Sequence, residues 1–267
     1  MVDNINFQTI MLKTALLSVL FFLPSRAYSQ APEPSVRDLS SPELFSEFLG
    51  ELRAKASEEA AKKKQPPSEE ARLFRRKVIP AFNKATGRGL TWTSFMMLHP
   101  DKAAAVFTAE ISISSASAEA YLKRGTAYKN MRRYAEAVED LTASVRLDHG
   151  LEKGYALYQR ALVRRLLARQ SSGAEKDAYN ADAFLDFGER LSLDAEDAYS
   201  YQGRGEIRFE TGQLKESASD YAKFFELCPD KSYADLVARG DVCRELAIKG
   251  IAPKGCRPKK FFEKRDQ

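Results

Sequence analysis

Apolar residues recur along this chain at intervals of three and four residues, which is the spacing of one face of an α-helix. The first such stripe comprises Leu44, Phe45, Phe48, Leu49 and Leu52. Ser41 and Pro42 precede it and suit the N-cap and the first turn of a helix. The prolines at 66–67 interrupt the pattern, and a second helical stretch follows, which Pro80 is expected to bend or end. Residues 42–86 are therefore predicted to form a helical N-terminal extension.

A dipeptide recurs downstream and indicates internal repeats. Arginine followed by glycine or alanine appears at intervals of 36, 36 and 44 residues, as Arg88-Gly89, Arg124-Gly125, Arg160-Ala161 and Arg204-Gly205. After each dipeptide, a small residue and a large apolar residue stand four apart: Ala103 and Phe107, Ala137 and Leu141, Ala183 and Phe187, Ser217 and Tyr221. Each unit is therefore predicted to be two helices joined by a short turn, and the chain to be all-α.

The unit from Ala118 to Leu151 resembles a tetratricopeptide repeat. The residues that match the family pattern are Tyr121, Gly125, Ala127, Tyr128, Tyr134, Ala137, Leu141, Leu147 and Asp148. The unit at 198–231 resembles it nearly as well, through Tyr201, Gly205, Gly212, Leu214, Tyr221, Leu227 and Pro229. The unit at 154–195 matches loosely, because Ala161 replaces the glycine and extra residues around 168–179 lengthen its turn or second helix. The unit at 87–117 is degenerate.

This resemblance implies a short α-solenoid of tetratricopeptide-like repeats over residues 87–231, because a lone helix pair cannot bury its apolar face. A further helix at 232–249 is expected to cap the array, and residues 250–267 form a basic tail. Gly125 and Gly205 have no Cβ and are expected to let the partner helix approach closely.

The resemblance also implies a concave face built mainly from the first helix of each unit. The positions expected to be exposed there are Glu119, Leu122, Thr126, Lys129, Asn130, Tyr155, Tyr158, Leu162, Arg165, Tyr199, Gln202, Glu206 and Phe209. Tyrosine and arginine are frequent anchors of interfaces, so this set suits a peptide or helix of a partner. The alternative is that these residues lie on ordinary solvated helix faces. Lys129 and Asn130 alone do not reproduce the set with which the family's chaperone-tail binders hold a terminal carboxylate, so that ligand is not expected.

Residues 1–29 contain charged, apolar and small residues in the order that is typical of a secretory signal peptide. A lysine, a short apolar run over 14–23 and small residues before a cleavage site after Ser29 follow one another. Residues 1–10 are interpreted as a start called too far upstream, and the Pro/Ser-rich residues 30–41 as a linker. We expect the mature protein in the periplasm or outside the cell; an uncleaved N-terminal anchor is the alternative.

Export changes the interpretation of the three cysteines, because disulfides persist in oxidising compartments. Cys243 and Cys256 are the favoured pair, since the glycines and proline between residues 250 and 255 could fold the tail back. Three unpaired thiols, including Cys228, are the alternative, because cysteine is often simply a small buried residue.

Composition excludes several classes of function. A net charge of +5 over 267 residues does not indicate a nucleic-acid binder, and two histidines leave no dense His/Cys metal site. His99 and His149 are interpreted as turn residues, and acids such as Glu136, Glu139 and Asp140 as a solvated face. No phosphate-binding loop, nucleophile elbow or paired catalytic motif occurs. The sequence therefore predicts no enzyme and no catalytic, cofactor-binding or metal-binding residue.

We expect a non-catalytic adaptor that holds a protein or peptide partner. The alternative is a structural subunit of a cell-envelope assembly that contacts partners or anionic surfaces through its outer helices or its basic tail. That tail carries Lys254, Arg257, Lys259, Lys260, Phe261, Phe262, Lys264 and Arg265. Peripheral contact with a membrane through these residues is the most that the sequence predicts, and a frayed, solvated tail is the simpler interpretation.

Overall fold

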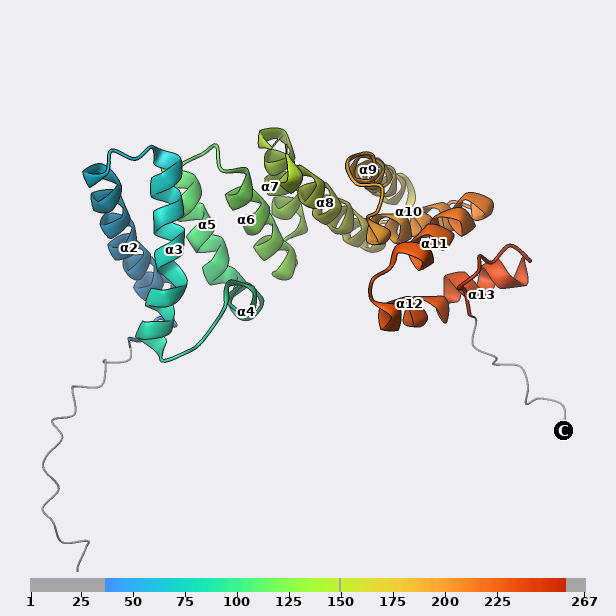
Figure 1. Ribbon diagram of the computed structural model, residues 1–267, viewed down its shortest axis with the longest axis horizontal. Coiled ribbons are helices and arrows are strands. Elements are labelled where there is room, and N and C mark those ends of the chain that lie inside the picture. Colours follow the sequence, from blue (N-terminus) through green and yellow to red (C-terminus); the bar gives the residue numbers. More distant parts are fainter. Residues whose placement is uncertain (1–36, 149, 258–267) are drawn as a thin grey trace, which may run out of the picture. The chain divides into compact units, whose positions relative to one another are not determined.

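The computed structural model describes residues 37–148 and 150–257, and all regular structure within them is helical (Figure 1). The helices are α2 (Pro42–Lys62), α3 (Pro67–Thr86), α4 (Trp92–Leu98), α5 (Pro100–Ile113), α6 (Ala118–Asn130), α7 (Tyr134–Leu147), α8 (Leu151–Gln170), α9 (Gly173–Leu193), α10 (Ala198–Glu210), α11 (Leu214–Leu227), α12 (Lys231–Ala238) and α13 (Asp241–Ile248). The predicted signal peptide, His149 and residues 258–267 of the basic tail lie outside the described residues. Among the described helices, none combines the length and the apolar character needed to cross a bilayer.

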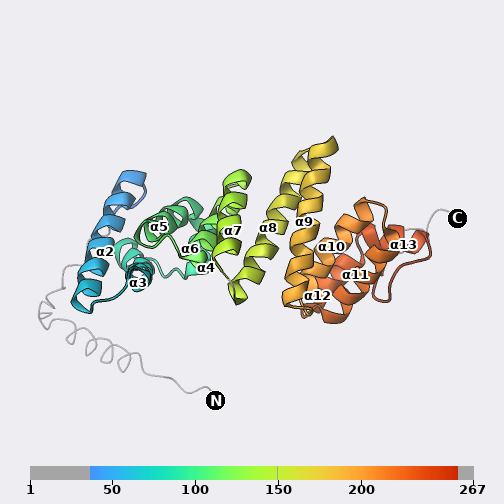
Figure 2. The same cartoon turned by 90° about the horizontal axis from the view of Figure 1, so that it is seen from above.

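Successive helices pair and then stack. The pairs α6–α7, α8–α9 and α10–α11 each make extensive contact, and α5 contacts α6, α7 contacts α8, and α9 contacts α10 (Figure 2). Contact restricted to neighbouring units is the mark of a repeat array. The predicted short α-solenoid is therefore confirmed.

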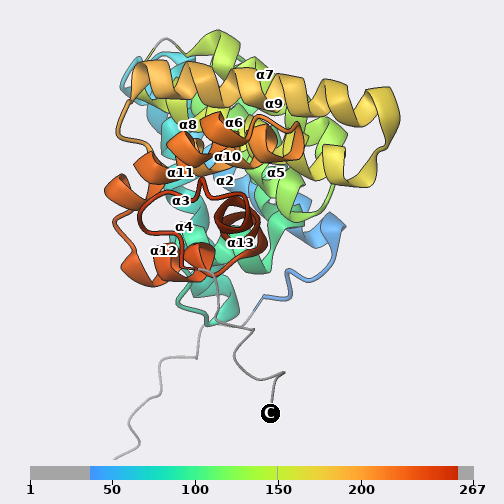
Figure 3. The same ribbon diagram turned by 90° about the vertical axis from the view of Figure 1, so that its right-hand side faces the viewer.

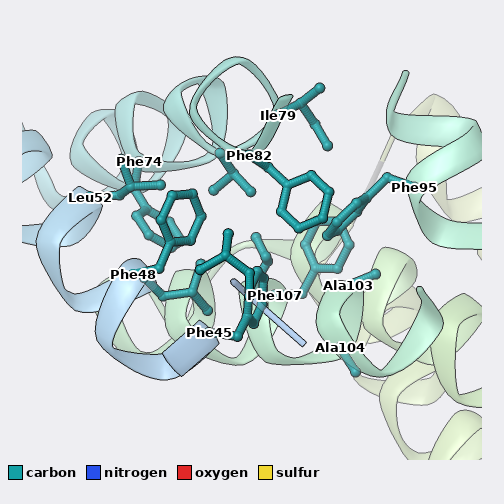
Figure 4. Close-up of a cluster of buried hydrophobic side chains, with 14 of the residues drawn as sticks. Phe45, Phe48, Leu52, Phe74, Ile79, Phe82, Phe95, Ala103, Ala104 and Phe107 are labelled. Atoms are coloured by element: carbon teal, nitrogen blue, oxygen red, sulfur yellow. The ribbon is translucent and has the colours of Figure 1, made fainter. Parts of the chain in front are cut away.

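The N-terminal extension packs on the first unit. Both α2 and α3 contact α5, and their aromatic side chains interlock with those of α4 and α5 (Figure 4). The ring centroids of Phe82 and Phe95 lie 5.1 Å apart in an edge-on arrangement, and both side chains are buried. The helix α3 runs through Pro80 and does not end there.

The middle unit is larger than its neighbours. Its helices α8 and α9 have 20 and 21 residues, whereas α6 and α7 have 13 and 14. The extra residues thus lengthen both helices, and not the turn or the second helix alone, so that α9 extends past α10 and α11 (Figure 3). The outer parts of the two long helices are mostly exposed from Arg169 to Lys176.

The C-terminal cap consists of two short helices, so the prediction of one helix over 232–249 is wrong. The chain breaks at Gly240, whose extended backbone (ψ 176°) ends α12 and begins α13. A disulfide joins Cys243 to Cys256, with Cα atoms 5.2 Å apart, and the amide of Arg257 donates to the carbonyl of Ala238 at 2.8 Å. Cys228 is a buried free thiol.

Candidate functional site

Three of the four recurring arginines, all but Arg88, bind an aspartate on the second helix of their own unit. The pairs are Arg124–Asp140, Arg160–Asp186 and Arg204–Asp220, each held by two hydrogen bonds of 2.6–3.0 Å. Asp140 is only 6% exposed, so its assignment to a solvated face is wrong. Arg124 draws the carboxylate between the helices, where a bidentate pair fixes their orientation.

Close helix contact accompanies these pairs. A Cβ at Gly125 would lie 2.9 Å from Cγ of Leu141, and a Cβ at Gly205 would lie 3.1 Å from Cδ2 of Tyr221. Both glycines therefore permit the approach that the sequence predicts. The second helices cover one side of α6, α8 and α10, and the groove residues expected from the sequence lie on these three first helices.

One depression gathers most of the predicted groove residues between α8, α10 and α12. We call it the tyrosine depression; its volume is about 410 Å³. It is lined by Lys129, Tyr158, Leu162, Arg165, Leu166, Arg169, Phe187, Tyr199, Gln202, Gly203, Glu206 and Tyr233. The ring centroids of Tyr199 and Tyr233 lie 5.7 Å apart, so aromatic faces form a continuous part of the wall.

The polar groups of the tyrosine depression are unevenly paired. The hydroxyl of Tyr233 donates to Gln202 at 3.0 Å, and the Gln202 amide donates to Glu206 at 3.1 Å. Lys129 donates to Oε1 of Gln159 at 2.6 Å, and it forms no ion pair with any residue that the structure describes. Burial lowers the pKa of Lys129 from its usual range. An ammonium group so placed gains from an added acceptor.

Three predicted groove residues are not available for binding in the way expected. Arg165 is 4% exposed and is occupied by Glu210, at 2.6 and 2.9 Å, and by Oδ1 of Asn180 at 2.7 Å. Leu122 is 3% exposed because it packs into a cluster between α6, α7 and α8. Phe209 is half-buried against the C-terminal apolar cluster.

The remaining predicted residues line a second depression, between α4, α6 and α8. We call it the methionine depression; its volume is about 320 Å³. Its lining combines the predicted Glu119, Thr126, Asn130 and Tyr155 with Arg75, Trp92, Thr93, Met96, Met97, Phe107 and Lys123. Sequence reasoning missed the contribution of α4, because the degenerate first unit offers no reliable register. The signal that could have found it is the unusual run Phe95-Met96-Met97-Leu98, with more apolar side chains than a short helix buries.

A buried carboxyl lies behind Glu119, where α3 meets α5 and α6. Glu110 is 1% exposed, and one of its oxygens lies 3.4 Å from a nitrogen of Arg75, which binds Glu119 at 2.7 Å. Burial raises the pKa of Glu110 to about 7, with Arg75 opposing the rise. The ionisation of Glu110 is therefore sensitive to how the N-terminal extension packs against the repeats.

His99 lies where α4 ends and α5 begins, as expected of a turn residue, with a ring nitrogen 3.0 Å from Arg88. Across the two described ranges, no group of three or more histidine, cysteine or carboxylate side chains could hold a metal ion.

Comparison with known proteins identifies one unit directly. Residues 118–149 match the family model described as tetratricopeptide repeat. No curated protein matches the chain. Among solved structures, YrrB, described as a TPR protein with an unusual peptide-binding site, is 21% identical with a TM-score of 0.45, covering 68% of this chain and 82% of YrrB. MamA is 17% identical with a TM-score of 0.44, covering 66% of this chain and 95% of MamA.

Proposed function

We propose that this protein, which carries a tetratricopeptide repeat over residues 118–149, is a non-catalytic interaction module. It binds a protein or peptide partner on the face formed by α6, α8 and α10. The tyrosine depression is the centre of this site. Its tyrosines offer large, rigid contact surfaces, and the polar chain of Tyr233, Gln202 and Glu206 offers donors and acceptors to a peptide backbone.

The observation that carries the proposal is the convergence at this depression. Five residues selected from the sequence alone, on three different helices, line one hollow and are not buried: Lys129, Tyr158, Tyr199, Gln202 and Glu206. Burial raises the pKa of Tyr158 above a usual value that already lies well above 7, so the hydroxyl is a donor over the whole physiological pH range. Lys129, which is bonded to Gln159 but forms no ion pair with a described residue, adds a cation that a partner's carboxylate would satisfy.

We further propose that the protein acts in the periplasm or outside the cell, after cleavage following Ser29. The order of residues 1–29 supports export, and the Cys243–Cys256 disulfide is of a kind that persists in an oxidising compartment. Sequencing the N-terminus of the protein recovered from an envelope fraction tests this. A mature chain that begins at Gln30 is expected, and an intact Met1 or Met11 start would contradict it.

Capture of partners from an envelope extract tests the binding site. The purified protein is compared with Tyr199→Ala, with Lys129→Ala and with Leu185→Ala, a control on α9 whose side chain is 67% exposed. We expect a protein that survives moderate salt, remains with Leu185→Ala and falls more than about tenfold with Tyr199→Ala, since a hot-spot residue contributes about 2 kcal/mol or more. Circular dichroism confirms that each variant is folded.

A further deletion separates the alternative function. Removing residues 258–267 keeps the Cys243–Cys256 disulfide and the hydrogen bond from Arg257 to Ala238, which hold the cap beside the tyrosine depression, and it removes most of the basic tail. A partner that disappears with this deletion and is indifferent to both Tyr199→Ala and Lys129→Ala would refute the proposed site and favour contact through the tail. Capture that disappears with salt alone would point to a polyanion.

A further inference from the structure

Exposed apolar side chains gather around the methionine depression. Met97 is 71% exposed, and the adjacent Leu98 is 62% exposed, at the end of the seven-residue helix α4. Across the depression, Tyr155 of α8 is 48% exposed. Single exposed apolar residues need no explanation, but two large ones in the lining of one hollow, Met97 and Tyr155, mark a surface that a partner covers.

The floor of this depression is rigid and its rim is adaptable. The indole ring of Trp92 is held against Phe95 and Phe107, with centroid distances of 5.7 and 5.5 Å. Met96 and Met97 form the rim, and unbranched methionine side chains adjust to irregular apolar groups. The volume of about 320 Å³ is at the lower end of the roughly 300–1,000 Å³ of ligand pockets, which suits one or two side chains.

One lysine in the lining, Lys123, has no close ion pair among the described residues, although it lies near enough to Glu152 to interact with that carboxylate electrostatically. Arg75 is occupied by Glu119 and Glu110, at 2.7 and 3.4 Å. Lys123, on the same face of α6, is half-buried and forms no ion pair with any residue in the described part of the chain. A cation beside an apolar hollow is complementary to a carboxylate beside an apolar side chain.

We infer that the methionine depression binds a partner segment in which a long apolar side chain, such as leucine, methionine or phenylalanine, stands next to an acidic residue. The apolar side chain inserts between Trp92, Met96 and Met97, and the carboxylate pairs with Lys123. This inference rests on the proposed function and specifies the chemistry of the partner at a site separate from the tyrosine depression.

Trp92 is the single tryptophan of the chain, so its fluorescence reports occupancy of this depression without a label. The probes are synthetic peptides on one glycine–serine scaffold that carries Leu-Asp-Asp, Ser-Asp-Asp or Leu-Lys-Lys. The wild-type protein is titrated alongside Lys123→Ala, Met97→Ser and the control Leu185→Ser. We expect the Leu-Asp-Asp peptide to shift the emission of Trp92 and to bind about tenfold more tightly than either other peptide.

The variants test which groups select the peptide. Lys123→Ala is expected to abolish the preference for aspartate over lysine, Met97→Ser to weaken the two leucine peptides about equally, and Leu185→Ser to change nothing. No response of Trp92 to any peptide at about 1 mM would overturn the inference, as would equal binding of all three. A captured partner that depends on Tyr199 and is indifferent to Met97→Ser and Lys123→Ala would overturn this inference alone and leave the proposed function standing.

Discussion

Gly203 lies inside α10 directly against the ring of Phe187 on α9. A Cβ at this position would lie 2.6 Å from Cε2 and 2.9 Å from Cε1 of the ring, and closer still to Cζ. Phe187 is fully buried and packs near Tyr158, so the only space open to the ring is the tyrosine depression, which it helps to line. Gly203→Ala therefore displaces the ring into that depression or forces α9 and α10 apart.

Two opposing effects set the change in the free energy of unfolding that Gly203→Ala causes. Alanine is favoured over glycine inside a helix by about 1 kcal/mol. Overpacking a closed core costs about 1–3 kcal/mol, and three ring atoms within contact distance place this site at the upper end. The net loss is about 2 kcal/mol, which lowers the melting temperature by about 4–8 °C in a chain of this size.

Gly188 supplies a matched control on the neighbouring helix. It also lies inside a helix, α9, but a Cβ there would meet nothing within 4 Å. Gly188→Ala is expected to gain about 1 kcal/mol, so the two glycine-to-alanine changes have opposite signs. Thermal and urea unfolding followed by circular dichroism at 222 nm measure both. A Gly203→Ala protein at least as stable as the wild type would refute the close-packing argument.

Three further predictions concern single contacts. The pKa of Glu110 is raised to about 7 from an ordinary 4.5, so the native state holds its proton to higher pH than the unfolded chain. The free energy of unfolding that this proton contributes below about pH 4.5 is therefore lost as the pH rises to about 7, by up to about 3 kcal/mol. Glu110→Gln should remove this loss, as measured by urea midpoints compared at about pH 5 and pH 8. Asp140→Asn deprives Arg124 of its ionic partner and should lower the free energy of unfolding by about 2–3 kcal/mol. Glu139→Gln, on the exposed face of the same helix, should change it by less than about 0.5 kcal/mol. Equal effects of the two substitutions in urea unfolding would contradict the structural role of the pair. Reduction of Cys243–Cys256 should lower the melting temperature of the wild type and leave a Cys243→Ser/Cys256→Ser protein unchanged, since a loop of this length stabilises by about 3 kcal/mol.

The sequence predicts the architecture because each helix pair requires small and large apolar residues at the same positions, so these residues recur at a regular spacing along the chain. The Arg-Gly dipeptide, Ala137 and Leu141 all mark contacts within one unit, and such contacts recur at a fixed spacing. The aspartate partners of the arginines are not recognisable in this way. They stand 16 residues after Arg124 and Arg204 but 26 after Arg160, and an acid on a helix gives no sign of whether it faces water.

The binding face is harder to predict, because exposure depends on neighbouring helices. Arg165 occupies a first-helix position, but the lengthened α9 and the end of α10 bring Asn180 and Glu210 onto its guanidinium. The sequence predicts extra residues around 168–179, but it does not predict that they bring Asn180 onto the guanidinium of Arg165. The sequence likewise does not predict that the expected groove divides into two depressions, one of which is lined by residues of the seven-residue helix α4.

The arginine pairs also bear on how the array unfolds. Besides its own aspartate, Arg124 donates to Thr108 of the preceding unit at 3.2 Å, and Arg160 donates to Thr142 at 3.1 Å. One guanidinium thus couples two successive units. Thr108 follows Phe107, and Thr142 follows Leu141. The equivalent position after Phe187 is Gly188, which has no hydroxyl that could accept a hydrogen bond from Arg204. In a nearest-neighbour array the last junction therefore depends on other contacts, above all the Arg165–Glu210 ion pair between α8 and α10 at 2.6 Å, so loss of that one pair would let α10–α13 open separately from the rest of the array.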